Sequence, residues 1–441
     1  MQPPYIDTGT PFGVRVLTLT VLYVAFSIWV KYVIGRSPVG FQRLILSIPV
    51  FVVSIASPWL FNSNDELLTR ISCAFIFSWL CTSKVLAFCL GRAPLREGMT
   101  APQIAAVMIL PVFPKPPERA KTGPVGRLHD TAGTGWVLAG RWMGKVVVLG
   151  LIAYIALTYG DSLPQVLRHY MHIMGLYSFV GFLMDGPAAL AVEALELPLV
   201  PTFDEPWKSC SLADFWGRRW NITTSSVLRV LLYDCIVDGA LINPRRSSTA
   251  EPVGPPAKTP ATPAAQDAAP EGQQSGGKQQ QQRQQQGAGA VAGRGTKPSM
   301  FRRQLGLHAT FLASGLIHEY ILWTVSGTGK WGWRWCLFFY MQAPLMTAEA
   351  YLGRLMRRAG LHAPLLLRIA LTHAVIERMS GPLFFVPVER DTDLAARVIR
   401  ATTANYLALL EPLGPLLGPL AAQVGQQLGP LLTAASAPFK A

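Results

Sequence analysis

The stretch that decides the fold covers residues 14–34 and reads VRVLTLTVLYVAFSIWVKYVI. A helix needs about 20 mainly apolar residues to cross a bilayer. This run therefore predicts a membrane-spanning helix. It lacks the small-residue cleavage site that follows the apolar part of a secretory signal, so we expect the helix to be retained.

Apolar runs of similar length recur along the chain. Half of the 441 residues are hydrophobic and only 15% are charged, against roughly a quarter in an average soluble domain, and the mean hydropathy is +0.30. The sequence predicts an all-α, polytopic integral membrane protein with about eight transmembrane helices. The predicted spans are 14–34, 43–61, 70–91, 142–160, 168–190, 305–326, 333–352 and 365–388. The run at 104–113 is too short to cross and predicts an interfacial or re-entrant piece.

The charged residues indicate an orientation. The net charge is +14, but the basic residues lie in short groups between apolar runs, so we expect membrane lipids as neighbours and no nucleic acid as partner. Segment 1–13 has one acid and no base, whereas 92–141 holds seven basic residues against three acids. The positive-inside rule then predicts a lumenal N-terminus and a cytosolic 92–141 loop. Two further crossings return the chain to the cytosolic face near 205–221.

Composition divides the chain into four regions. An N-terminal membrane region covers 1–243, and a C-terminal membrane region with a His-Glu helix covers 299–390. Between them, 244–298 is rich in Pro, Ala and Gln, which predicts a disordered cytosolic insert. The remaining 391–441 form a tail with repeated Gly-Pro-Leu phrases. The six cysteines contain no CxxC pair, so we expect no metal site from them.

Ionisable groups inside a membrane are costly and are functional candidates by default. His318 lies with Glu319 in the middle of the apolar stretch FLASGLIHEYILW. A neutral histidine can take a proton near physiological pH, which suits a general base that activates a hydroxyl group. The alternative is a packing histidine bonded to a neighbouring helix. A zinc-binding HExxH motif is excluded, because position 322 holds Leu322.

Other ionisable groups in the predicted spans favour structural roles. His373 and Glu377 share a helix face, and a structural pair or an interfacial anchor explains them at least as well as catalysis. His169 and His172 lie at the start of their span, where an interfacial position is the simpler interpretation. Asp185 precedes Gly186-Pro187, which suggests a helix break.

The stretch 211–221, SLADFWGRRWN, concentrates aromatic and charged groups on the predicted cytosolic side. Arginine offers forked donors suited to phosphate, and tryptophan rings sit at membrane boundaries. The stretch therefore suits a mouth at which a soluble, anionic carrier delivers an apolar group. An aromatic belt with topological arginines is the alternative, but it does not account for the nearby Asp214 and Asn221.

The motifs together resemble a known family. SLADFWGRRWN, preceded by FDEPW and followed by SSVLRVLLYD, is similar to the signature of plant-type wax synthases, long-chain-alcohol O-fatty-acyltransferases related to the membrane-bound O-acyltransferases. LIHEY resembles their histidine-bearing helix, and LGRAPL, ILPVFPK and GPLFFVPV resemble further landmarks. Asn221 and His318 are 97 positions apart here, and removing the 55-residue insert leaves 42, similar to the separation in relatives.

The resemblance implies acyl transfer from acyl-CoA to a long-chain fatty alcohol, which forms wax esters in the endoplasmic reticulum. It implies that His318 and Asn221 are catalytic and that no metal or prosthetic group is needed, with acyl-CoA as co-substrate. Arg218 and Arg219 would hold the CoA phosphates. The expected substrate-binding residues are Asp214, Trp216, Arg218, Arg219, Trp220 and Glu319. A sterol or diacylglycerol acceptor is the alternative, and a proton-coupled transporter is the non-enzymatic one, although we find no internal repeat.

Overall fold

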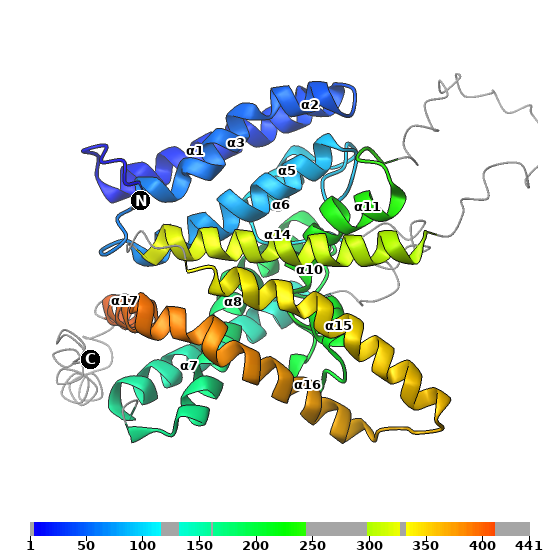
Figure 1. Cartoon of the computed structure of the whole chain (residues 1–441). Coiled ribbons are helices and arrows are strands. Elements are labelled where there is room, and N and C mark those ends of the chain that lie inside the picture. Colours follow the sequence, from blue (N-terminus) through cyan, green and yellow to red (C-terminus); the bar gives the residue numbers. More distant parts are fainter. Residues whose placement is uncertain (1–3, 116–131, 160–161, 244–297, 327–331, 411–441) are drawn as a thin grey trace, which may run out of the picture.

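A computed structural model describes residues 4–115, 132–159, 162–243, 298–326 and 332–410. Within these ranges the regular elements are helices and no strand occurs, apart from one isolated antiparallel bridge between Pro114 and Leu199 (Figure 1). The all-α prediction is therefore confirmed. Most of the predicted insert (244–297) and most of the predicted tail (411–441) lie outside the described residues.

Among the described residues before 196, the N-terminal region contains nine α-helices or π-helices, together with short 3₁₀ turns. They are α1 (Phe12–Tyr32), α2 (Phe41–Leu46), α3 (Ile48–Ala56), α4 (Leu67–Cys73), the π-helix η3 (Ala74–Cys81), α5 (Thr82–Cys89), α6 (Ala101–Ile109), α7 (Gly135–Tyr159) and α8 (Gln165–Leu195). The 3₁₀ turns are η1 (Ile34–Arg36), η2 (Ser57–Leu60) and, further on, η6 (Pro206–Lys208).

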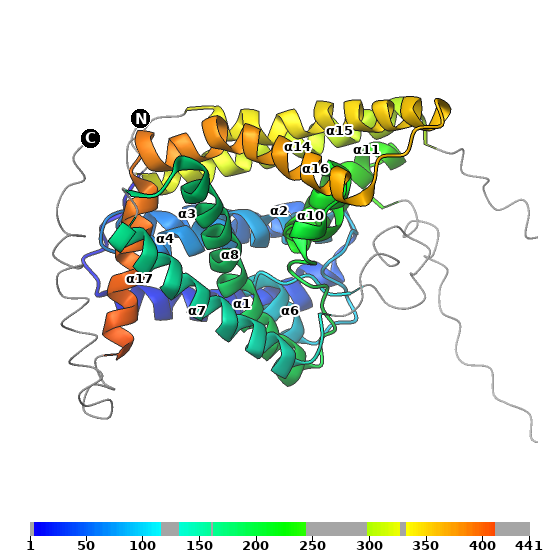
Figure 2. The same cartoon turned by 90° about the horizontal axis from the view of Figure 1, so that it is seen from below.

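A chain of short elements follows, and longer helices complete the fold. The short elements are α9 (Leu212–Asp214), the π-helix η7 (Phe215–Arg219), α10 (Ile222–Leu228), the π-helix η8 (Arg229–Tyr233) and α11 (Asp234–Asp238). The later elements are α14 (Met300–Ser326), α15 (Arg334–Arg358), α16 (Leu365–Ser380), the π-helices η9 (Gly381–Phe385) and η10 (Pro387–Asp391), and α17 (Leu394–Leu410). Figure 2 shows α14, α15 and α16 gathered along one edge of the molecule.

All eight stretches predicted to span the membrane contain helix, but their lengths and compositions differ. Among the described residues, four helices are long and apolar enough to cross a bilayer: Phe12–Arg36, Leu67–Cys89, Gly135–Ala156 and Gln165–Leu195. The apolar helix at Ile48–Leu60 is shorter. Helices α14, α15 and α16 do not combine the length and the apolar composition needed to be counted as candidate spans in the same way. The structure therefore supports four candidate membrane spans among the described residues, and the predicted number of about eight is not confirmed.

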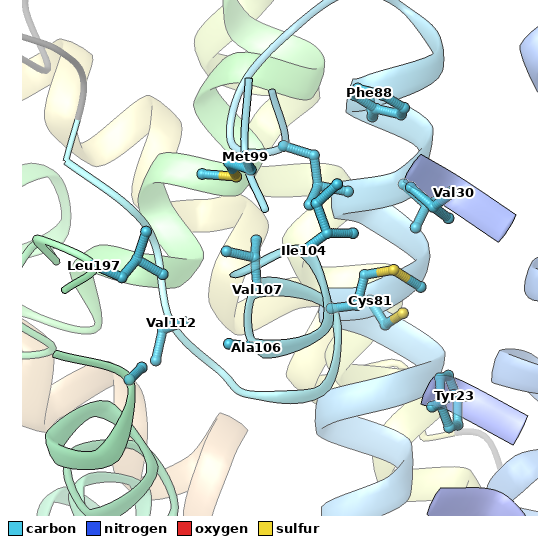
Figure 3. Packing of buried hydrophobic residues seen from close by; sticks show 14 of the residues in the cluster. Tyr23, Val30, Cys81, Phe88, Met99, Ile104, Ala106, Val107, Val112 and Leu197 are labelled. Carbon is cyan, nitrogen blue, oxygen red and sulfur yellow. The ribbon is translucent and has the colours of Figure 1, made fainter. Parts of the chain in front are cut away.

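The N-terminal core lies between α1, α5 and α6. Figure 3 shows Tyr23 and Val30 of α1 facing Cys81, Phe88 and the apolar side chains of α6. The predicted short piece at 104–113 thus contributes a buried helix to this core. Fully buried Lys84 donates from Nζ to the carbonyl oxygens of Val107 and Leu110, 2.8 Å each. It satisfies carbonyls at the C-terminal end of α6, which lack partners within that helix.

One buried and one partly buried arginine join the N-terminal and C-terminal regions. Arg70 of α4 donates from Nε to Thr324 O at 2.8 Å and from Nη1 to Phe61 O at 2.6 Å. Arg397 of α17 donates to Ser326 O at 2.7 Å. Both satisfy carbonyls in the last turn of α14, where a positive charge is favourable. Helix α14 also packs against α4, η3 and α15, so it connects the two regions (Figure 1).

The pair of helices α7 and α8 is held by an ion pair in its interior. Lys145 donates to the carboxylate of Asp185, and both side chains are almost fully buried. Helix α8 continues through Pro187 to Leu195, so the suggested break at Asp185 is wrong. The helix stays continuous there because Lys145 of α7 neutralises the Asp185 carboxylate, while α8 packs along α7.

Candidate active site

A cavity of about 620 Å³ lies between α8, the 206–233 segment, α14, α15 and α16. Its wall is mostly aromatic and aliphatic, and it includes both His318 and Asn221. Cavities of several hundred Å³ with an apolar wall and a few convergent polar groups are typical ligand sites. The structure therefore brings the two predicted catalytic residues, which are far apart in the chain, into one cavity.

His318 is held where α14 and α15 approach closely. A Cβ at Gly315, three residues earlier, would lie 2.6 Å from the carbonyl oxygen of Cys336. Only glycine allows this approach without displacing the backbone of α15. The close packing brings Phe339 of α15 onto the imidazole of His318, with ring centroids 3.8 Å apart and planes at 25°.

One nitrogen of the His318 ring forms a hydrogen bond to the backbone of its own helix. Nδ1 lies 2.7 Å from the carbonyl oxygen of Ser314. A carbonyl can only accept, so Nδ1 carries the proton and donates it. In the neutral imidazole Nε2 is then an acceptor, which is the tautomer that a general base requires.

Aromatic rings surround His318 on other sides. Trp79 of η3 meets the imidazole edge-on at 5.1 Å, and Trp335 of α15 does so at 6.2 Å. This apolar cage fixes the orientation of the ring, so Nε2 keeps a defined position toward a bound substrate.

Asn221 lies at the start of α10 with φ +41° and ψ +62°, a left-handed conformation that asparagine tolerates better than most residues. Its Oδ1 accepts from the backbone N–H of Thr224 at 3.3 Å, which caps the helix. This bond orients the amide and leaves Nδ2 without a partner among the described residues. The Asn221 amide can therefore donate to a ligand in the cavity.

The two tryptophans predicted to bind substrate line the same cavity. Trp216 donates from Nε1 to Oε1 of Gln342 at 3.0 Å, and Gln342 is fully buried on α15. Trp220 stacks on Phe215, with centroids 5.4 Å apart. Their rings form apolar wall between Asn221 and the opposite helices.

The charged residues of the 211–221 stretch lie away from the cavity wall. Arg219 donates from Nε to Asp214 at 2.9 Å and from Nη1 to the Asp204 carbonyl at 3.2 Å. Burial alone would lower the pKa of Arg219, but its bond to Asp214 and their charge attraction outweigh burial and raise it. Arg218 is exposed. In the structure, the bond between Asp214 and Arg219 stabilises the 204–219 segment. Contact of Asp214, Arg218 or Arg219 with substrate stays a prediction.

Glu319 follows His318 but points elsewhere. It is 1% exposed, and its Oε1 accepts from the backbone N–H groups of Gly332 and Trp333 at 2.9 and 2.8 Å. Its Oε2 accepts from the N–H of Cys336 at 3.2 Å. These groups begin α15 and would otherwise lack partners. Glu319 is not in the cavity wall, and its visible role is to anchor the helix that carries Phe339.

Two further histidines, His169 and His373, contact other segments of the chain. His169 is buried, stacks on Phe385 and lies 3.4 Å from Oε1 of Glu377, while its interfacial depth stays a prediction. The pairing with a carboxylate on α16 explains why it lies inside. His373 also lines the cavity and bonds through Nε2 to Trp207 O at 3.2 Å.

Sequence reasoning missed Phe339, Trp335 and Gln342. Gln342 was detectable, because an amide in the apolar stretch FFYMQAPLM needs a buried partner. The rings carried no such signal, since aromatic residues are common in every predicted span. No group of three or more His, Cys, Asp or Glu side chains that could hold a metal ion occurs in the described part of the chain.

Chemically, the site places an unprotonated imidazole nitrogen and an amide donor around a largely apolar cavity. The first can remove a proton from a hydroxyl group. The second can stabilise negative charge that develops on an oxygen. This combination suits transfer of an acyl group to an alcohol.

Comparison with protein-family models gives no match. Comparison with curated proteins gives acyltransferases. Acyl-CoA–sterol O-acyltransferase 1 of Arabidopsis thaliana is 32% identical over 201 residues, 45% of this chain and 55% of that protein. "Probable long-chain-alcohol O-fatty-acyltransferase 1" of the same plant is 30% identical over 199 residues, again 45% and 55%.

A third relative matches over a greater length. "Probable long-chain-alcohol O-fatty-acyltransferase 8" of Arabidopsis thaliana is 25% identical over 375 residues, 84% of this chain and 89% of that protein. The chain spans about half the length of the first two relatives. The resemblance to long-chain-alcohol O-fatty-acyltransferases is confirmed.

Proposed function

We propose that this protein is an acyl-CoA-dependent O-acyltransferase that esterifies long-chain fatty alcohols to wax esters. The observation that carries the proposal is the shared cavity of His318 and Asn221, in which His318 Nδ1–H is bound to Ser314 O and Nε2 is left as the base. The similarity to long-chain-alcohol O-fatty-acyltransferases supports the reaction class.

In the proposed reaction the alcohol oxygen attacks the carbonyl carbon of the thioester while His318 Nε2 removes the hydroxyl proton. Asn221 Nδ2 donates to the oxygen that becomes negative. The C–S bond then breaks, and the proton passes from His318 to the leaving thiolate, so that the products are the ester and free CoA. The reaction as proposed needs no metal or prosthetic group, because binding supplies alignment and a dry environment.

A sterol is the second candidate acceptor. The relative with 32% identity is named as an acyl-CoA–sterol acyltransferase. The aromatic wall of Trp216, Trp220 and Phe338 suits the flat face of a ring system as well as a flexible chain. Diacylglycerol is a third alternative.

We further propose that all eight predicted segments cross the membrane of the endoplasmic reticulum, with the polar groups of α14 shielded by neighbouring helices. The polar groups of α14 support this, since Glu319 and Ser314 are buried and bonded inside the protein. The membrane can then tolerate helices that are less apolar than the other candidates. The cytosolic loops predicted from charge would place the 211–221 stretch on the side of soluble acyl-CoA.

Expression in cells devoid of neutral-lipid synthesis tests the proposal. The cells receive labelled acyl donor with a fatty alcohol, a sterol or diacylglycerol in turn. Labelled wax ester is the expected product, and labelled sterol ester alone would replace the first acceptor by the second. If no labelled ester forms with any acceptor while the protein is present in the membrane, the acyltransferase proposal fails.

A further inference from the structure

One face of the 221–229 segment is the polar side of an otherwise apolar cavity. Asn221, Thr224, Ser225 and Arg229 all line the cavity. Thr224 and Ser225 follow Asn221 by three and four residues, and Arg229 follows Ser225 by four, so the four residues lie along one side of the helix formed by α10 and η8. The described wall thus carries a polar strip that leads away from the reaction centre.

Two members of this strip have polar atoms without partners. Thr224 is 7% exposed, and its Oγ1 is buried with no hydrogen bond among the described residues. The Nε of Arg229 is also buried without a hydrogen bond there. It forms an ion pair with Oδ1 of Asp234 at 3.7 Å, a separation too long for a hydrogen bond, and the guanidinium lies 5.4 Å from the ring centroid of Tyr233. Buried polar groups are nearly always paired, so the two atoms point to a ligand in the cavity.

The neighbouring polar groups are already used by the protein. The Ser225 hydroxyl donates to the carbonyl oxygen of Trp216 at 2.7 Å, and Asn221 Oδ1 caps α10. Thr224 Oγ1 and Arg229 Nε differ from these groups because neither has a hydrogen bond among the described residues, although Arg229 pairs ionically with Asp234.

The ligand that fits these groups follows from the proposed function, on which this inference rests. A fatty alcohol or a sterol has one hydroxyl, which His318 engages in the proposed reaction, while Asn221 donates to the thioester oxygen. Acyl-CoA, in contrast, carries its thioester on a pantetheine arm with two amides and a hydroxyl, followed by phosphates. Amide groups pair with a threonine hydroxyl, and phosphate oxygens pair with the forked donors of arginine.

The direction of the strip agrees with this ligand. Arg229 lies eight residues beyond Asn221, about 12 Å along a helix axis. The chain then continues into α11, where Asp238 pairs with Arg92 at 3.1 Å. Arg92 begins the loop that the charge pattern predicts to be cytosolic. We propose that Thr224 hydrogen-bonds the pantetheine arm of acyl-CoA and that Arg229 binds one of its phosphates.

The test compares two donors with the purified protein in nanodiscs at a saturating alcohol concentration. One donor is a long-chain acyl-CoA, and the other carries the same acyl group on N-acetylcysteamine, which has one amide and no phosphate. Arg229→Met should raise the KM for acyl-CoA about 10-fold or more, as expected for loss of a charge-assisted hydrogen bond. It should leave the KM for the short thioester unchanged.

Variants of Thr224 provide a second, independent test of the proposed pantetheine contact. Thr224→Val should raise the KM for both donors about 5-fold, because both retain an amide near the thioester. Thr224→Ser should restore the wild-type value. The matched controls are Arg303→Met, on the exposed start of α14, and Thr223→Val, which is buried outside the cavity wall. Both should keep wild-type KM values.

Several results would overturn the inference. An unchanged KM for acyl-CoA in Arg229→Met, or an equal rise for both donors, removes the phosphate contact. A dependence on acidic phospholipid in the nanodisc instead of on the donor assigns Arg229 to a lipid headgroup. If the methionine variant does not fold, Arg229→Lys must show a smaller rise for acyl-CoA alone. A wild-type protein that makes ester, with no variant affected, defeats only this inference, whereas a wild type that makes none defeats the proposed function as well.

Discussion

At the scale of single residues, the proposed catalytic atoms of His318 and Asn221 are set by the hydrogen bonds that the other polar atoms of these side chains make. His318 Nδ1 is bound to Ser314 O, and Asn221 Oδ1 is bound to the N–H of Thr224. Each bond leaves the other polar atom of the same side chain for a ligand. The fold therefore sets the tautomer of the histidine and the orientation of the amide before any substrate arrives.

Asn221→Asp separates the two roles of this residue. Aspartate keeps the oxygen that caps α10 and tolerates the left-handed conformation, but it loses the amide donor. We expect kcat to fall about 10²- to 10³-fold, the usual cost of one lost donor to a developing oxyanion, with little change in thermal stability. Turnover with purified protein and a melting curve measure the two effects. A stable variant that retains most of its turnover would show that Asn221 serves only as a cap.

The sequence predicted His318 and Asn221 because an intramembrane histidine and a dense polar motif are unusual against an apolar background. It did not predict what Glu319 and Arg219 bind. Adjacent residues on a helix point about 100° apart, so Glu319 faces the start of α15 while His318 faces the cavity. The sequence pattern places His318 and Glu319 on one helix, but it cannot show that Glu319 binds the start of α15 or that Arg219 binds Asp214.

At the scale of elements, the start of α15 depends on one carboxylate from α14. Glu319→Ala should leave three backbone N–H groups unpaired in the interior and lower the free energy of unfolding by about 3 kcal/mol or more. It should also reduce activity, because Phe339 and Trp335 lie on the helix that is released. Glu319→Gln keeps an acceptor and should cost less. Thermal unfolding in detergent compares the variants, and an alanine variant as stable as wild type would contradict the anchoring role.

The α7–α8 pair depends on Lys145 and Asp185. Removing one partner leaves an unpaired buried charge, so Lys145→Met alone should destabilise the protein by about 3–5 kcal/mol. Lys145→Met combined with Asp185→Leu removes both charges and should recover most of that loss. A double-mutant cycle of unfolding free energies measures the coupling. Additive single effects would mean that the two side chains do not act as a pair.

At the scale of the whole molecule, the site is built from both membrane regions. Helix α10 supplies Asn221 and helix α14 supplies His318, although 97 positions separate them. The sequence predicted the helical class and four of the membrane spans, because a long apolar run can satisfy its backbone hydrogen bonds in a bilayer only as a helix. It could not fix the number of spans, since α14 to α16 carry polar groups whose bonds depend on tertiary contacts.

Deleting Gln273 to Gly293 should leave membrane integration and activity near wild type. The described site lies entirely outside this segment, and its composition predicts few contacts. A change in loop length alone costs little free energy. Membrane fractionation and ester formation test the deletion. A well-expressed but inactive deletion variant would show that the segment takes part in the site.

If His318 is the base of an acyl transfer, replacing it with alanine should remove most of the activity. Alanine preserves the helix but removes the proton acceptor, which typically contributes about 10²- to 10⁴-fold to rate. With His373→Ala as the matched control in the same cavity, labelled ester formation is measured at equal protein level. We predict a loss of at least about 100-fold for His318→Ala and a much smaller loss for His373→Ala. Retention of most activity in His318→Ala, together with its loss in His373→Ala, would contradict the account.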